Sequence, residues 1–102
     1  MDVELARQHW LDGTRRVEGA RTDRRRHALL QGGVDLVVDG LRRRIGQTFT
    51  LAELAAAYDG ADDWVRELLD ENHPEGAVPV EPGTVADAAF HVYARGALDY
   101  KP

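Results

Sequence analysis

The chain contains no cysteine and no serine, and its single lysine, Lys101, lies next to the C-terminus. Disulfides, thiolate metal ligands and serine or cysteine nucleophiles are therefore excluded. A phosphate-binding loop of the G-x-x-x-x-G-K-S/T type is excluded too, because the motif requires a lysine. These absences remove the common routes to catalysis, so we expect a protein that is not an enzyme and binds no cofactor.

Long apolar runs are also missing. The most apolar segment, residues 28–41, is interrupted by two aspartates, whereas a membrane-spanning helix needs about 20 predominantly apolar residues. Near the N-terminus, Asp2 and Glu4 stand where a secretory signal would need a basic start and an apolar run. We therefore expect a cytoplasmic protein with no membrane partner.

The four histidines are scattered, and no two of them have the spacing of a metal site, so we expect no bound metal. Asp87 and His91 are four residues apart in the last expected helix. That spacing is more typical of a surface pair than of a catalytic dyad or a ligand pair. Trp10 and Trp64 are expected to anchor the core rather than to bind a cofactor.

The chain does contain apolar residues at helical spacing. With 102 residues, 43% of them apolar, it fits one domain with one core. The spacing predicts a helix over residues 3–20, with Asp2 as its N-cap and a possible break at Gly13. We expect a single all-α domain over residues 1–102, a small bundle of about five helices.

A second helix is predicted over residues 23–45, with two lines of residues that can pack. The first line is Leu30, Val34, Val37, Leu41 and Ile45. The second line is Leu29, Gly33, Leu36 and Gly40. Because glycine within a helix costs about 1 kcal/mol relative to alanine, these glycines indicate close approach of another backbone. Either this is the central helix, buried on two sides, or the glycine line is a homodimer or partner interface. A strand over residues 34–38 is disfavoured, because the aspartates do not alternate with the valines.

The segment TFTLAEL, residues 48–54, predicts the start of a third helix at Leu51. Thr50 and Glu53 have the spacing of a capping box, and Phe49 can pack on Leu54. This helix should end near residues 59–60, and a fourth helix should follow over residues 62–71.

These two helices have the spacing of a helix-turn-helix, but their charge disfavours binding to DNA. From Asp59 to Glu71 there are six acidic residues and one arginine, and a recognition helix with this charge would be repelled by phosphates. The pair is expected to have a packing role or to bind a protein through its acidic residues. The candidate acidic residues are Asp62, Asp63, Glu67 and Asp70.

Three of the four prolines lie in residues 73–83, which predicts a Pro/Gly-rich linker. After it, Thr84 and Asp87 repeat the capping spacing, ahead of a last helix that runs to about Arg95. Residues 96–102 are expected to form a loose tail.

Charge is divided unevenly along the chain. Residues 1–46 carry ten arginines against seven acidic residues, and residues 47–102 carry three basic residues against eleven acidic ones. Two arginine clusters stand 18 residues apart in the second helix, or roughly 27 Å if the helix is unbroken. They are Arg24, Arg25, Arg26 and Arg42, Arg43, Arg44. These arginines could form a solvated face with salt bridges to the acidic half, bind an acidic protein, or bind nucleic acid. Nucleic acid is disfavoured, because no aromatic residues are interleaved with the clusters.

The stretch LRRRIGQTFTLAELAAAYDGADDW, residues 41–64, resembles a group of short, functionally uncharacterised actinobacterial proteins. The resemblance covers less than a quarter of the chain and carries no catalytic motif. It therefore implies no activity.

Two functions follow from these patterns. The first is a non-enzymatic interaction module, a small adaptor or regulator that docks a protein partner or a second copy of itself through a surface with separated charges. Its candidate residues are the arginine clusters, the glycine line and the acidic residues of the fourth helix. The alternative is a nucleic-acid-associated regulator that binds through the arginine clusters.

Overall fold

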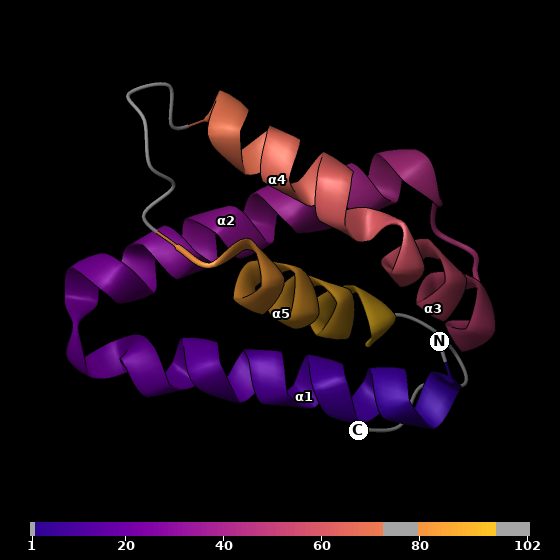
Figure 1. The fold of residues 1–102 in the computed structure, drawn as a ribbon, viewed down its shortest axis with the longest axis horizontal. Helices are drawn as coiled ribbons and strands as arrows, with labels where there is room; N and C mark the ends of the chain where they lie inside the picture. Colours follow the sequence, from indigo (N-terminus) through magenta and orange to yellow (C-terminus); the bar gives the residue numbers. More distant parts are fainter. Residues whose placement is uncertain (1, 73–79, 96–102) are drawn as a thin grey trace.

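The structure is a computed structural model that describes residues 2–72 and 80–95. The described residues form five α-helices and one turn of 3-10 helix (Figure 1). In chain order they are α1 (Val3–Gly19), the 3-10 turn (Ala20–Thr22), α2 (Arg24–Arg44), α3 (Leu51–Asp59), α4 (Ala61–Glu71) and α5 (Pro82–Ala94). The all-α fold predicted from the sequence is confirmed.

The central helix is α5, with α1 on one side of it and α2 and α4 on the other (Figure 1). Ten of its 13 residues are buried. Its side chains are mostly small and apolar, so it can be covered on nearly all sides, and Val92 is its one large apolar residue that is substantially exposed. The prediction that the second helix is central is wrong, because α2 carries charged side chains along its outer face and α5 does not.

Helix α1 continues through Gly13, where the sequence suggested a break. A Cβ atom at Gly13 would lie 2.2 Å from Cβ of Asp87 and 3.0 Å from the backbone nitrogen of Ala88. Gly13 therefore allows the backbones of α1 and α5 to approach each other, which no larger residue would permit at this distance.

Helix α2 packs against other helices along both predicted lines. Leu30, Val34, Val37 and Leu41 of the first line are buried, and Ile45 is half-buried as the C-cap residue. On the second line, a Cβ at Gly33 would meet Val85 at 3.1 Å, and one at Gly40 would meet Trp64 at 3.0 Å.

These contacts correct one predicted interface. Gly33 is covered by α4 and α5 and Gly40 by α4 of the same chain, so neither glycine is open to a homodimer or another partner. Leu29 and Leu36 of the same line are half-buried.

The start of α3 at Leu51 and its end at Asp59 are confirmed. The N–H of Glu53 donates to Oγ1 of Thr50 over 3.2 Å, as predicted. In return, the hydroxyl of Thr50 donates to Oε1 of Glu53 over 3.1 Å, whereas in a complete capping box the Glu53 side chain accepts from the backbone N–H of Thr50. Phe49 stacks on Tyr93 of α5, with 4.6 Å between ring centroids.

The last helix begins earlier than predicted. Pro82 occupies its first turn and Glu81 is the N-cap residue, so Thr84 lies within the first turn. Proline is favoured at the first helical position because its φ is already helical and its missing N–H has no helical partner there. The predicted linker therefore ends by residue 81. Residues 73–79 of that linker and the predicted tail 96–102 lie outside the described residues.

Candidate functional site

The two predicted arginine clusters lie at opposite ends of α2, because that helix is unbroken. The basic start of α2 is Arg24, Arg25 and Arg26, in its first turn; the basic end is Arg42, Arg43 and Arg44, in its last turn. All six side chains belong to exposed residues.

The basic end of α2 makes contacts within its own chain. Nη1 of Arg42 lies 3.1 Å from Oδ1 of Asp39, and the guanidinium of Arg44 lies 4.4 Å from the ring centroid of Trp64. Cations are also favoured near the C-terminus of a helix, where the helix dipole is negative. Trp64, Arg43 and Arg44 line a shallow cavity of about 290 Å³, together with Gly40 and Leu68.

The basic start of α2 has no such partners. None of its three arginines lies within 4 Å of a carboxylate among the described residues. Asp23 caps the helix by accepting from the backbone N–H of Arg26 over 3.1 Å. The three guanidinium groups therefore face solvent.

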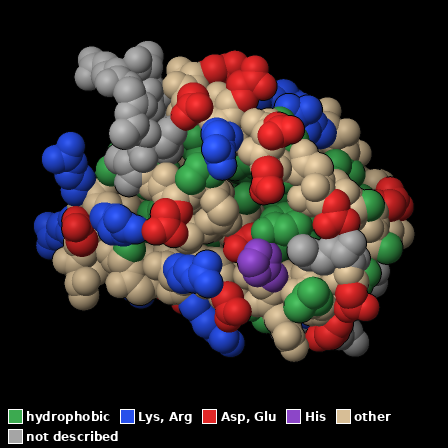
Figure 2. Space-filling view, in the orientation of Figure 1, with side chains coloured by type: hydrophobic (Ala, Val, Ile, Leu, Met, Phe, Trp, Pro, Cys, Tyr) green, Lys and Arg blue, Asp and Glu red, His purple; other side chains and the backbone are tan. Residues whose placement is uncertain are grey.

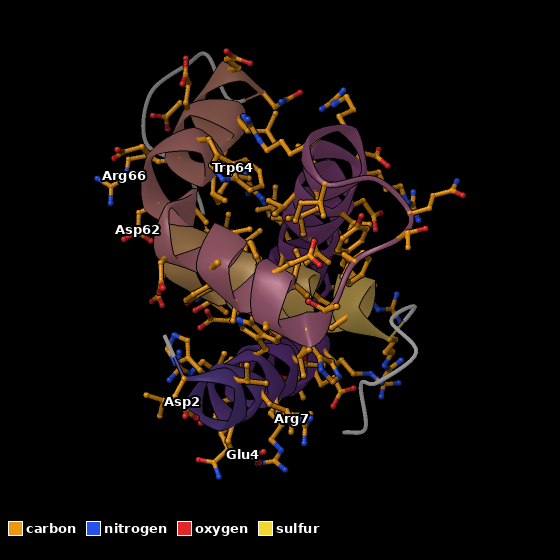
Figure 3. The ribbon with its side chains drawn as sticks, turned by 90° about the vertical axis from the view of Figure 1, so that its right-hand side faces the viewer. Asp2, Glu4, Arg7, Asp62, Trp64 and Arg66 are labelled. Atoms are coloured by element: carbon orange, nitrogen blue, oxygen red, sulfur yellow. The ribbon has the colours of Figure 1, made fainter. Side chains whose placement is uncertain are left out.

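The acidic face of α4 is defined by Asp62, Asp63, Glu67 and Asp70, all exposed. No described arginine or histidine lies within ion-pair distance of any of these four carboxylates. Asp62 and Arg66 are on the outer side of α4, whereas Trp64 is on the side that faces α2 (Figure 3).

The sequence leaves open whether the basic and acidic halves pair with each other, and the described residues contain ion pairs both within the basic half and between the two halves. The pairs Arg7–Glu4, Arg15–Asp12 and Arg42–Asp39 each span three residues of one helix in the basic half. His9 of the basic half pairs with Asp87 of the acidic half. Figure 2 shows several Arg side chains, with Asp or Glu side chains among them, at the end of the molecule where α1 turns into α2, and mostly Asp and Glu side chains over α4. Both charged groups thus point outward.

A buried carboxylate cluster joins three helices. Asp87 of α5 is 2% exposed; it accepts a hydrogen bond from the hydroxyl of Tyr58 in α3, and its Oδ2 lies 3.2 Å from Nε2 of His9 in α1. His91 is buried as well. The predicted surface pair of Asp87 and His91 is therefore wrong, because α5 has almost no surface.

Burial sets the protonation of this cluster. Burial raises the pKa of Asp87 above its ordinary value, and the hydrogen bond from Tyr58 and the nearby His9 and Arg16 offset part of that rise. Burial, together with the bond to Asp87, also raises the pKa of Tyr58. For His91, burial lowers the pKa, and Arg95 adds to the effect.

Sequence reasoning missed this cluster because its members are far apart in the chain. Tyr58 and Asp87 are 29 residues apart, so no local spacing links them. The available signal was an aspartate within an otherwise apolar helix, since a buried carboxylate requires hydrogen-bond partners.

The described residues also bear on metals and membranes. No group of three or more of their His, Asp and Glu side chains is arranged to hold a metal ion. Among their helices, none has both the length and the apolar character that crossing a bilayer requires.

Comparison with known proteins adds no family: neither a family model, nor a curated protein, nor a solved structure matches this chain. The resemblance of residues 41–64 to short actinobacterial proteins stays a prediction.

Proposed function

We propose that this chain is a non-enzymatic docking module that binds a protein partner through the acidic face of α4. The observation that carries the proposal is that the four carboxylates of this face are exposed and lack an ion-pair partner among the described residues. A partner with a basic surface would supply those missing partners. The cytoplasmic location predicted from the sequence belongs to the same proposal.

The expected contribution of such a surface is mainly to the rate and selectivity of association. Complementary charges steer two proteins together and repel partners of the same sign, whereas each exposed pair adds little affinity. Binding should therefore weaken markedly as salt rises.

The Asp87 cluster is assigned a structural role in this proposal. His9, Tyr58 and Asp87 do not line the cavity beside Phe49 and Tyr93, the cavity beside Trp64 and Leu68, or the cavity beside Val34 and Ala88. What these side chains do contact is one another, across α1, α3 and α5. Their arrangement supports helix packing better than it supports a reaction.

Nucleic-acid binding through the arginine clusters has weaker support. Arg42 and Arg44 already have contacts within the chain, which leaves the basic start of α2 as the more open cluster. A few arginines at one helix end would give weak, salt-sensitive binding without sequence preference.

Affinity capture with immobilised protein tests the proposal. The acid-neutralised variant carries Asp62→Asn, Asp63→Asn, Glu67→Gln and Asp70→Asn. A control variant neutralises as many exposed acids elsewhere: Glu4→Gln, Asp12→Asn, Glu18→Gln and Asp35→Asn. A defined set of proteins should be retained by the wild type and the control at low salt, and be lost from the acid-neutralised variant.

Two results would count against docking by α4. Retention of the same proteins by the acid-neutralised variant overturns the role of this face. The captured proteins could instead be lost after nuclease treatment and also be lost from the variant Arg24→Gln/Arg25→Gln/Arg26→Gln. That result supports the nucleic-acid alternative.

A further inference from the structure

Charged residues near helix ends are favourable or unfavourable according to the helix dipole, which is positive at the N-terminus and negative at the C-terminus. Two charged groups of this chain lie at the helix end where the dipole stabilises their charge. Asp62 and Asp63 lie in the first turn of α4, and the basic end of α2 lies in its last turn. Local electrostatics accounts for both groups.

Two other charged groups lie at the helix end where the dipole destabilises their charge. The basic start of α2 places three arginines in a first turn that contains no acidic residue. The last turn of α4 contains Asp70 and Glu71 and no basic residue. Each group adds to a helix-end charge of its own sign, which destabilises the isolated chain.

These two groups do not compensate each other within one chain. No ion pair joins them among the described residues. Figure 1 shows why: α2 begins at one end of the long axis, where the chain turns from α1, whereas α4 ends on the upper edge of the molecule.

We propose that a second copy of this chain supplies the missing partner: the basic start of α2 in one copy docks on the acidic end of α4 in another. The acidic end of α4 is Glu67, Asp70 and Glu71, three exposed carboxylates that match three exposed arginines. The contact also places the positive end of one helix dipole against the negative end of another. This inference rests on the proposed function, because it names the partner of the acidic α4 surface.

Complementary variants test self-association directly. The base-neutralised variant carries Arg24→Gln, Arg25→Gln and Arg26→Gln; the acid-end variant carries Glu67→Gln, Asp70→Asn and Glu71→Gln. Sedimentation of the wild type should show association that weakens at least about tenfold between about 50 and about 500 mM NaCl. Each variant alone should be monomeric.

An equimolar mixture of the two variants is the decisive sample. Each variant keeps one intact surface, so the mixture should form 1:1 heterodimers although neither component self-associates. The matched control, Arg42→Gln/Arg43→Gln/Arg44→Gln, changes charge equally at the other end of α2 and should associate like the wild type. The three arginines at the basic start of α2, Asp70 and Glu71 are unfavourable to the isolated helices, and Glu67 is exposed, so circular dichroism should show that the variants remain folded.

A wild type that is monomeric at low salt overturns the inference, as does a mixture that stays monomeric. If capture of other proteins by the acidic face of α4 persists in that case, only the self-association is wrong. If capture is lost as well, the proposed function falls with it. If the control variant does not associate, the contact lies at the basic end of α2, and the inference is overturned.

Discussion

Asp87 is a carboxylate buried on the central helix, and its protonation should govern part of the pH dependence of stability. Because burial raises its pKa in the folded chain, the stability that it contributes is fully present below the pKa of the unfolded chain. That stability is lost as the pH rises through the folded-state pKa. This is the reverse of the behaviour of a surface carboxylate in an ion pair.

The variant Asp87→Asn isolates this effect, since asparagine keeps the shape and can still accept from Tyr58. Relative to the variant, the wild type should become more stable as the pH falls from about 7 toward about 4. Denaturant unfolding at several pH values measures the difference. A difference that does not vary with pH, or that varies in the opposite direction, contradicts the assignment.

Tyr58 is the hydrogen-bond donor that satisfies this carboxylate from α3. Tyr58→Phe removes the donor and retains the ring, so it should cost about 1–3 kcal/mol in the free energy of unfolding at neutral pH. Combined with Asp87→Asn, the two changes should be non-additive by about 0.5–3 kcal/mol, because they disrupt one interaction. Additive losses would show that the hydroxyl and the carboxylate do not depend on each other.

At the scale of the helices, Gly13 controls how closely α1 approaches α5. A methyl group at this position would clash with Asp87 and with the backbone of Ala88, and the backbone cannot yield as a flexible side chain can. Gly13→Ala should therefore destabilise the chain by about 1–3 kcal/mol or more.

Gly32 provides the matched control for that substitution. It lies in α2, is exposed, and would have nothing within 4 Å of an added Cβ. Gly32→Ala should stabilise the chain by up to about 1 kcal/mol, because alanine has the higher helix propensity. Thermal unfolding of both variants measures the contrast, and a gain in stability for Gly13→Ala would refute the close helix contact.

The two ends of α2 should respond in opposite ways to the same change of charge. Arg25→Glu, at the positive end of the helix dipole, should raise the free energy of unfolding by about 0.3–1 kcal/mol at low salt. Arg43→Glu, at the negative end, should lower it by a similar amount. The measurement belongs at dilute protein concentration, where self-association does not contribute. Equal effects of the two substitutions would show that the helix dipole is not the cause.

Features that depend on neighbours in the sequence were predictable, and those that depend on distant neighbours were not. The cap of Thr50 on Glu53 is local, and the start of α3 followed from it. The exposure of the acidic residues of α4 could be predicted, because they lie opposite the apolar stripe of that helix. The burial of Asp87 could not, because it depends on α1, which lies at the other end of the chain.

For the whole molecule, the decisive arrangement is that the last described helix in the sequence is the central one. Helices α1, α2 and α4 all pack on α5, so the core is incomplete until α5 is in place. A local pattern cannot reveal this, although α5 differs from the other long helices in carrying no arginine.

This topology predicts that the chain cannot fold without α5. A fragment of residues 1–79 should lack cooperative unfolding and show greatly reduced helicity, because the inner faces of α1, α2 and α4 would be exposed to water. A synthetic peptide of residues 80–95 should restore helicity when added in excess, since it supplies the missing apolar surface. Circular dichroism during a titration with the peptide measures the recovery, and the same peptide with Ala89→Asp and Phe90→Asp, which would bury two charges, is the control that should fail. A fragment that unfolds cooperatively on its own would show that α5 attaches to a preformed bundle.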